Sequence, residues 1–202
     1  SDLFSREIEE GIDANDCAGP DVRRTTHRAG VLKAASDTGQ LDEAERLAFE
    51  EVAAAHRRTG APVITHCEPA RGLEQVAFLG SRGVAPQHLI LSHTDRHPDP
   101  AYHRELFRSG VFLEYDRVFR APLDETNPTL QLFATMVKEF PSQLMLGTDA
   151  ARPSYWRHYG GGPGLDVLLL DFSARARRLG VTDAELDQVF VHNPARAYAF
   201  RD

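Results

Sequence analysis

Short apolar runs recur along this chain, and four of them end at a side chain that can bind a metal ion. Lys33 follows Ala29-Gly-Val-Leu, His66 follows Pro62-Val-Ile-Thr, His93 follows Leu89-Ile-Leu-Ser, and Asp149 follows Leu144-Met-Leu-Gly-Thr. Runs that are nearly continuous in Val, Ile and Leu are typical of strands buried on both faces, as in a parallel sheet covered by helices. The pattern therefore predicts an α/β fold.

The segments between the runs have the composition of helices. Residues 41–58 are rich in Ala, Glu and Arg, Gly60 is a natural helix stop, and Pro62 opens the next run. Successive strand ends lie 23 to 33 residues apart, close to the ~31 residues of one unit in an eight-stranded barrel. Five strands are predicted, ending at Lys33, His66, His93, Asp116 and Asp149.

The helices are expected between and after these strands. We predict them over Leu3–Ile12, Leu41–Arg58, Gly72–Arg82, Pro100–Ser109, Pro128–Phe140 and Gly164–Leu179. The sequence Thr182-Asp-Ala-Glu185 is a capping box and predicts another helix start. Asn193-Pro194 predicts a last short helix, with Asn193 as its N-cap and Pro194 at the first helical position.

Because the carboxyl ends of parallel strands meet at one edge of a sheet, the four strand-end side chains are expected to converge on one site. Two imidazoles and a carboxylate suit zinc, manganese, cobalt or iron better than calcium or magnesium. Lys33 is the unusual member, since a protonated amine repels cations and needs a lowered pKa or a chemical conversion to become a ligand.

Composition narrows the class of partner. With 42% hydrophobic and 26% charged residues, the 202-residue chain is expected to form one globular domain over residues 1–202. The formal charge of −7 argues against nucleic acid and favours a small-molecule substrate. No apolar stretch approaches the ~20 residues that cross a bilayer, so we expect no membrane partner and a cytoplasmic location. Cys17 and Cys67 are expected to be free thiols.

A metal-free flavodoxin-like or Rossmann-like domain is the main alternative fold. It is disfavoured because the Gly-x-Gly-x-x-Gly fingerprint is missing after the first strand. The loop after Asp149 carries Arg152, Tyr155, Trp156 and the glycine-rich stretch 160–164, which we interpret as a lid or pocket wall.

Six segments together resemble the phosphotriesterase family of the metal-dependent amidohydrolase superfamily. They are Arg28-Ala-Gly-Val-Leu-Lys33-Ala-Ala, Val63-Ile-Thr-His66, Leu91-Ser-His93-Thr-Asp95, Phe112-Leu-Glu-Tyr-Asp116-Arg117, Leu146-Gly-Thr-Asp149 and Val191-His-Asn193-Pro194-Ala-Arg196. The resemblance is collinear and covers nearly the whole chain.

This resemblance implies a (β/α)8 TIM barrel of the amidohydrolase type with two divalent metal ions at its mouth, zinc first, with cobalt, manganese or iron as alternatives. Lys33 matches the family's bridging lysine, which is carbamylated. His66 and His93 match the ligands of the more exposed metal. Asp149 matches the ligand of the buried metal that also serves as the catalytic proton acceptor for a bridging hydroxide.

The chain departs from the family pattern in one respect. The family opens its barrel with a His-x-His motif that supplies two ligands of the buried metal, and no His-x-His occurs here. The chain therefore resembles about the last five βα units, and we expect it to be impaired when it acts alone. An inactive or pseudoenzyme barrel module that serves assembly is the alternative.

The resemblance also suggests substrates. Asp116-Arg117 is similar to the Asp-Arg pair of lactonase-like members, which makes Arg117 a candidate substrate-binding residue, and Trp156 is a second candidate in the loop after Asp149. We expect a hydrolase of a lactone, ester or phosphotriester, with amide hydrolysis left open. A homodimer is a further possibility.

Overall fold

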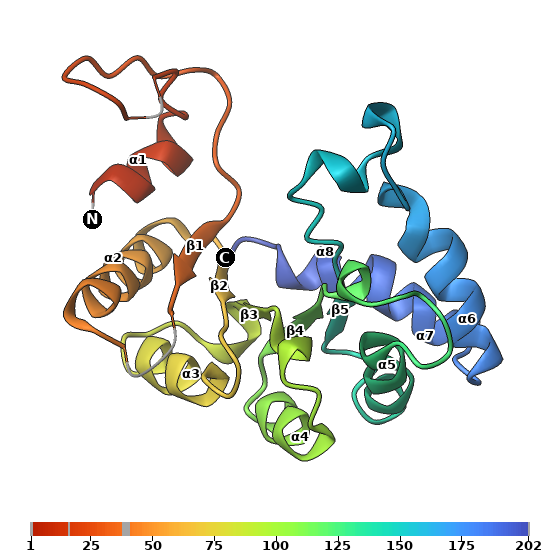
Figure 1. Cartoon of the computed structure of the whole chain (residues 1–202). Helices are drawn as coiled ribbons and strands as arrows, with labels where there is room; N and C mark the ends of the chain where they lie inside the picture. Colours follow the sequence, from red (N-terminus) through yellow and green to blue (C-terminus); the bar gives the residue numbers. More distant parts are fainter. Residues whose placement is uncertain (1, 16, 38–40, 202) are drawn as a thin grey trace.

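Five parallel strands form a single sheet in the order β1-β2-β3-β4-β5 (Figure 1). The structure is a computed structural model that describes residues 2–15, 17–37 and 41–201. The strands are β1 Leu32–Ala35, β2 Val63–His66, β3 Leu89–Ser92, β4 Phe112–Tyr115 and β5 Leu144–Leu146. Helical segments connect each strand to the next, so the predicted α/β fold on a parallel sheet is confirmed.

The outer face of the sheet packs against helices. These are α2 Glu43–Thr59, α3 Gly72–Gly80, α4 Pro100–Arg108 and α5 Pro128–Glu139 (Figure 1). Val63, Leu91 and Leu113 point to this face and belong to the main core with Phe49 and Phe133, all fully buried. Apolar burial on this face therefore holds each helix beside its strands.

Side-chain caps fix several helix ends where the sequence predicts them. In α2, Asp42 and Glu45 form a reciprocal capping box, and Gly60 ends the helix in the left-handed conformation. Thr182 and Glu185 form the predicted capping box of α7, Asp183–Asp187. At the N-terminus, α1 spans Asp2–Glu9 and is shorter than predicted.

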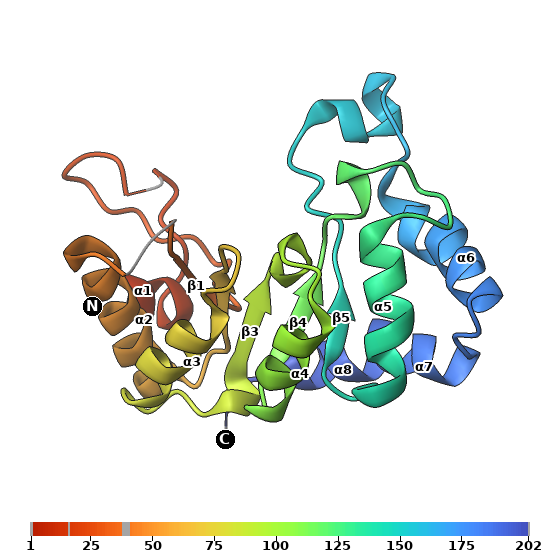
Figure 2. The same ribbon diagram turned by 60° about the horizontal axis from the view of Figure 1, so that its bottom comes forward.

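The inner face of the sheet carries two rows of side chains. Strand register aligns Lys33, Ile64, Ile90 and Phe112 in one row, and Ala35, His66, Ser92, Glu114 and Met145 in the next. Ile64, Ile90, Phe112 and Met145 from these rows pack together with Ala197 of α8, Asn193–Ala197. Figure 2 shows α4 and α5 on one side of the strands and α8 on the other. Polar side chains on this face therefore gather toward the carboxyl ends.

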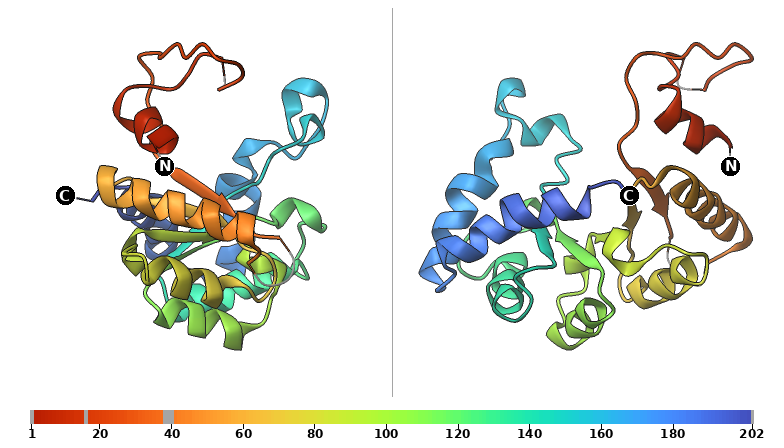
Figure 3. Two further views of the ribbon diagram at one scale, coloured as in Figure 1. Left: turned by 90° about the vertical axis from the view of Figure 1, so that its left-hand side faces the viewer. Right: turned by 180° about the vertical axis from the view of Figure 1, so that it is seen from behind.

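The prediction that Asn193 caps a separate helix is wrong. A π-helical turn over Gln188–His192 continues directly into α8, so no helix begins there. Asn193 is instead fully buried, and its Nδ2 donates to the carbonyl oxygens of Pro141 and Leu144, each at 2.7 Å. Its role is to tie the C-terminal helices, seen from behind in Figure 3, to β5. A second π-helical turn, Leu168–Phe172, precedes α6, Ser173–Arg178.

Two strand boundaries also differ from the prediction. β1 continues past Lys33 to Ala35, which places Lys33 in the strand rather than at its end. β5 stops at Leu146, so Asp149 lies in the following loop. Within the described part of the chain, no helix has the length and apolar character needed to span a membrane.

Candidate active site

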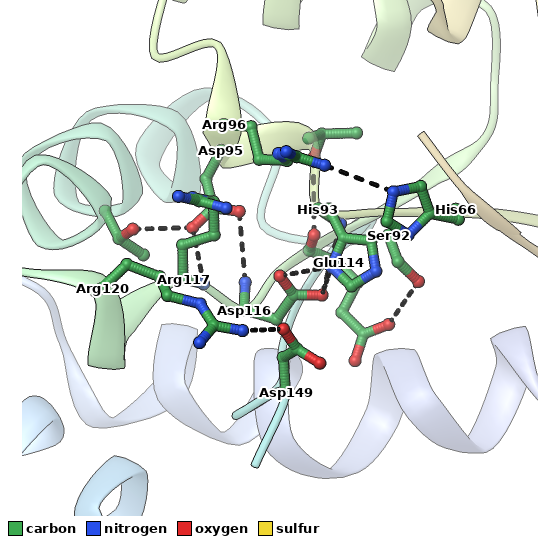
Figure 4. A network of polar contacts seen from close by, with 12 residues as sticks. His66, Ser92, His93, Asp95, Arg96, Glu114, Asp116, Arg117, Arg120 and Asp149 are labelled. Atoms are coloured by element: carbon green, nitrogen blue, oxygen red, sulfur yellow. Dashed lines mark hydrogen bonds and ion pairs between the residues drawn. The ribbon is translucent and has the colours of Figure 1, made fainter. Parts of the chain in front are cut away.

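A cavity of about 510 Å³ opens at the carboxyl ends of the strands. His66 ends β2, His93 follows β3, and Asp149 follows β5, and all three side chains line this cavity (Figure 4). The imidazole rings of His66 and His93 lie 4.4 Å apart between centroids. The parallel sheet thus brings together three of the four predicted metal-binding residues.

His93 is held from below by Asp116, the residue that follows β4. Its Nδ1 lies 2.8 Å from Oδ1 of Asp116, and its backbone N–H donates to Oδ2 of the same carboxylate at 3.2 Å. A carboxylate only accepts, so Nδ1 carries the hydrogen and Nε2 keeps its lone pair. His93 also adopts a left-handed backbone, with φ of 62°, which ends the strand and turns its ring into the cavity.

His66 is oriented in the same way by Glu68. Its Nε2 lies 2.8 Å from Oε1 of Glu68 and 3.2 Å from Nη1 of Arg96. The guanidinium of Arg96 also pairs with Oε1 of Glu68. Since a guanidinium only donates, Nε2 cannot serve both partners, and the shorter contact assigns its hydrogen to Glu68. Nδ1 of His66 is therefore the nitrogen left for a ligand.

The charge of Glu68 is stabilised by these contacts. Burial raises its pKa, but the hydrogen bond with His66 and the charge of Arg96 outweigh that effect and lower the pKa overall. A carboxylate that holds one imidazole N–H fixes the tautomer and increases the basicity of the other nitrogen.

A buried carboxylate, Asp95, lies under this layer. It accepts the backbone N–H groups of Asp116 at 3.3 Å and Arg117 at 3.0 Å, and the hydroxyl of Thr129 at 2.6 Å. Burial, with the neighbouring Asp116 charge, raises the pKa of Asp95 to about 6. Asp95 thus holds the turn that presents both Asp116 and Arg117.

Asp149 faces a cation in the cavity. The guanidinium of Arg120 pairs with its Oδ2 (Figure 4). It also donates to the hydroxyl of Tyr155. The backbone of Asp149 is left-handed, with φ of 42°. Aspartate tolerates this conformation better than most residues other than glycine.

Lys33 lies on the inner face of the sheet, one row below His66. Partial burial lowers the pKa of Lys33, against the opposing attraction of Glu114, Asp116 and Asp149. Glu114, in the row above, accepts the hydroxyl of Ser92 at 3.0 Å, and burial together with the charge of Asp116 raises its pKa. The side chain of Lys33 is exposed on this face, and its amine is attracted by these carboxylates.

The two predicted substrate-binding residues lie in different places. Arg117 lines the main cavity, whereas Trp156 lines a neighbouring pocket and donates from Nε1 to the carbonyl of Ala150 at 2.8 Å. Arg152 belongs to both pockets. Four arginines and one carboxylate, Asp149, line the main cavity: Arg96, Arg117, Arg120 and Arg152. Arg96 is paired with Glu68 and Arg120 with Asp149, so Arg117 and Arg152 give the cavity its excess positive charge.

The side chains fit a metal ion in part. His66 and His93 each have one nitrogen fixed by a carboxylate and the other available, which is how metal-binding histidines are usually held. Asp149 is engaged by Arg120, however, and across the described residues no three His, Cys, Asp or Glu side chains form a group ready to hold an ion. The histidine pair suits one ion, while Asp149 requires a rearrangement.

Several residues of this site are not among the predicted site residues. Glu68 follows His66 by two positions, so its closeness to His66 could have been predicted from the sequence. Arg120 and Glu114 have no such signal, because their positions depend on the turn after β4 and on the register of β4. Tyr155 lines the main cavity and Trp156 does not, and this difference depends on the conformation of the loop after Asp149.

The comparisons with known proteins agree with this arrangement. A model of the phosphotriesterase family matches residues 1–198. A phospho-furanose lactonase from Mycoplasmopsis synoviae is 30% identical and is matched over 96% of this chain and 57% of its own length. Among solved structures, an amidohydrolase from Mycoplasma synoviae has a TM-score of 0.90 at 29% identity, covering 100% of this chain and 59% of that one.

A phosphotriesterase homology protein from Escherichia coli, complexed with phosphate in its active site, has a TM-score of 0.82 at 25% identity, covering 96% of this chain and 64% of that one. The chain thus spans less than two thirds of the length of each of these relatives. Because the family model matches nearly all of its residues, the chain belongs to the phosphotriesterase family.

Proposed function

We propose that this chain carries part of the active site of a metal-dependent hydrolase whose substrate is a lactone bearing a phosphate group. The observation that carries the proposal is the arrangement of four arginines around the His66 and His93 pair in one cavity. Arginine is the residue best suited to phosphate, since its planar fork donates two hydrogen bonds at once. In an acidic chain with a net charge of −7, such a basic cavity indicates an anionic ligand.

Two relatives support the choice of substrate. One is named a phospho-furanose lactonase, and another was solved with phosphate in its active site. The same family supports an amidohydrolase-type barrel as the complete fold, in which these five strands contribute one part. A phosphotriester remains the second substrate class for the same reasons.

His66, His93, Asp149 and a carbamylated Lys33 would hold two divalent ions, zinc being the first candidate. Such ions lower the pKa of a bound water and polarise the bond under attack. The residues themselves orient and hold the reactants. Glu68 and Asp116 fix the tautomers of the two histidines, and the arginines hold the phosphate of the substrate.

Hydrolysis of a lactone joins the oxygen of water to the carbonyl carbon and breaks the ring C–O bond, leaving a hydroxyl group and a carboxylic acid that ionises by releasing a proton to solvent. Asp149 is the proposed proton acceptor for the attacking water. The proton then passes to the ring oxygen as it leaves.

A metal-free module that serves assembly is the second candidate. The observation in its favour is the pairing of Asp149 with Arg120, together with the lack, within the described residues, of a ready group of three ligands. It would bind less than one metal ion per chain and turn over no substrate.

The test is metal analysis of the purified full chain, followed by a substrate panel. The panel contains a phosphorylated γ-lactone, the same lactone without phosphate, a phosphotriester and an N-acyl amide. We expect about one metal ion per chain, retained by His66 and His93, and slow hydrolysis that favours the phosphorylated lactone. Less than one bound ion together with no turnover of any substrate would establish the assembly module instead.

Two variants sharpen this test. His93→Ala is expected to lose the metal ion, because it removes one of the two paired imidazoles. Arg152→Gln is expected to raise KM for the phosphorylated lactone at least tenfold and to leave KM for the unphosphorylated lactone unchanged. Equal effects of Arg152→Gln on both lactones would contradict the phosphate assignment.

A further inference from the structure

Arg120 occupies the carboxylate that the proposed metal centre needs. It lies in the turn Val118–Arg120 after β4, and its guanidinium reaches across the cavity to Oδ2 of Asp149 in the loop after β5 (Figure 4). The other two candidate ligands in the cavity, His66 and His93, are held by carboxylates below them and keep one nitrogen available. Of these three described residues, Asp149 is the one whose candidate ligand atom is paired with a cation.

Arg120 has a second resting place that does not involve Asp149. Its Nη1 donates to the hydroxyl of Tyr155, and its Cζ lies 5.4 Å from the centroid of the Tyr155 ring. The ring of Tyr155 in turn packs on Phe119, 5.0 Å away between centroids. Released from Asp149, the guanidinium would therefore remain in the cavity, beside the face of an aromatic ring.

The pair of Arg120 and Asp149 is neither deeply buried nor fully solvated. The two side chains are 25% and 31% exposed. A divalent ion attracts the carboxylate with twice the charge of a guanidinium, and a doubly charged anion attracts the guanidinium with twice the charge of a carboxylate. A divalent ion at Asp149 or a doubly charged anion at Arg120 each competes with the ion pair between these two residues. When both ligands are bound, each member of the pair has a more strongly charged partner.

We infer that Arg120 is a displaceable internal cation that couples metal binding at Asp149 to anion binding in the cavity. In the free chain Arg120 neutralises Asp149. When the phosphate of a substrate enters, Arg120 turns to it and frees the carboxylate for the metal ion. The inference rests on the proposed function, since it assumes a metal ion and an anionic substrate at this site.

Metal affinity measures this coupling without any turnover. Competition with a chromophoric chelator measures the affinity of the full chain for Co²⁺, for the wild type and for Arg120→Gln. The variant is expected to bind Co²⁺ at least fivefold more tightly, because the competing cation is gone. Arg152→Gln is the matched control: it removes the same charge from the same cavity, and among the described contacts it has no pairing with Asp149, so its effect is expected to stay below twofold.

A double-mutant cycle identifies the partner. In an Asp149→Asn background, Arg120→Gln is expected to leave the Co²⁺ affinity unchanged, because the carboxylate for which the two cations compete has been removed. An equal gain in both backgrounds would show a general charge effect and would overturn the inference.

Sulfate serves as the probe for the anion, with sodium chloride at the same ionic strength as the control. Sulfate is expected to tighten Co²⁺ binding to the wild type severalfold and to have no such effect on Arg120→Gln. By linkage, Co²⁺ must tighten sulfate binding by the same factor. A sulfate effect that persists in Arg120→Gln overturns the coupling through Arg120, whereas a wild type that binds no Co²⁺ at all overturns the proposed function as well.

Discussion

Asp116 determines how His93 faces the cavity. It accepts both the ring Nδ1–H and the backbone N–H of His93, and its own backbone N–H is held by Asp95. His93 has a left-handed backbone, so the contact with Asp116 also holds an unfavourable conformation in place. The geometry of this histidine therefore depends on a residue that does not itself line the cavity.

We predict that Asp116→Asn weakens Co²⁺ binding by about 10- to 100-fold, because the neutral amide no longer fixes the imidazole tautomer or increases its basicity. Competition with a chromophoric chelator measures the affinity. Glu139→Gln is the control, since it also replaces a carboxylate by an amide but in a surface pair with Arg104. An unchanged affinity in Asp116→Asn would show that the contact does not tune His93.

At the scale of the elements, Gly147, which directly follows β5, lies close to Glu114 of the second inner row of the sheet. A Cβ on Gly147 would stand 2.2 Å from Oε1 of Glu114 and 3.3 Å from Cβ of Asp116. We predict that Gly147→Ala destabilises the chain by about 1–3 kcal/mol, because the packed carboxylate must move. Urea unfolding measures the loss. Gly80→Ala is the control, with open space around the added methyl group, and should be neutral or slightly stabilising.

The attachment of the C-terminal helices gives a second prediction. Asn193 is fully buried and donates to two carbonyl groups near β5. We predict that Asn193→Ala costs about 1–3 kcal/mol, because both carbonyl oxygens lose their partner. His192→Ala, next to it but exposed, should cost less than about 1 kcal/mol, since it removes only a surface pair with Asp187. Comparable losses in thermal or urea unfolding would contradict the assignment.

The elements show what local sequence determines. The strands and the first helices are set by apolar runs and caps, such as the box of Asp42 and Glu45, so they can be predicted. Asn193-Pro194 has the local pattern of a helix start, but the role of Asn193 is set by the carbonyl groups of Pro141 and Leu144, which lie far away in the sequence. The pairing of Arg120 with Asp149 likewise depends on two loops meeting in space. Tertiary contacts of this kind leave no local pattern.

At the scale of the whole molecule, buried titratable groups make stability depend on pH in opposite directions. His103 is fully buried between two partners: its Nε2 donates to the carbonyl of His97 at 2.9 Å, and its Nδ1 accepts from the hydroxyl of Tyr115 at 2.7 Å. The contact with Tyr115 requires an unprotonated Nδ1 and therefore the neutral ring, and burial lowers the pKa of His103 from 6.5 to about 4.

Between pH 6.5 and about 4 the unfolded chain therefore binds a proton at His103 that the folded chain does not. The contribution of neutral His103 to the free energy of unfolding is complete above pH 6.5. It is lost as the pH falls through this range, and the total loss is limited to about 3 kcal/mol. Asp95 acts in the opposite sense. Its pKa is raised from 3.8 to about 6, so the folded chain binds the extra proton and is destabilised as the pH rises through that range.

We predict that the two slopes largely oppose each other in the wild type between pH 4 and 6. His103→Gln removes the first slope, so the variant should gain stability relative to the wild type as the pH is lowered from 6.5 to 4. Urea unfolding at several pH values measures the difference. A constant difference between the two chains across this range would show that His103 takes up its proton equally in the folded and unfolded chains, and would contradict the lowered pKa.

The second inner row of the sheet, Ala35, His66, Ser92, Glu114 and Met145, has a consequence for engineering this site. Each member lies beside the next one on the neighbouring strand, and the hydroxyl of Ser92 already donates to Glu114. A new side chain at one position changes the space open to its neighbour. Libraries that aim to alter substrate preference should therefore randomise adjacent members of the row jointly, because the best residue at each position depends on the residue beside it.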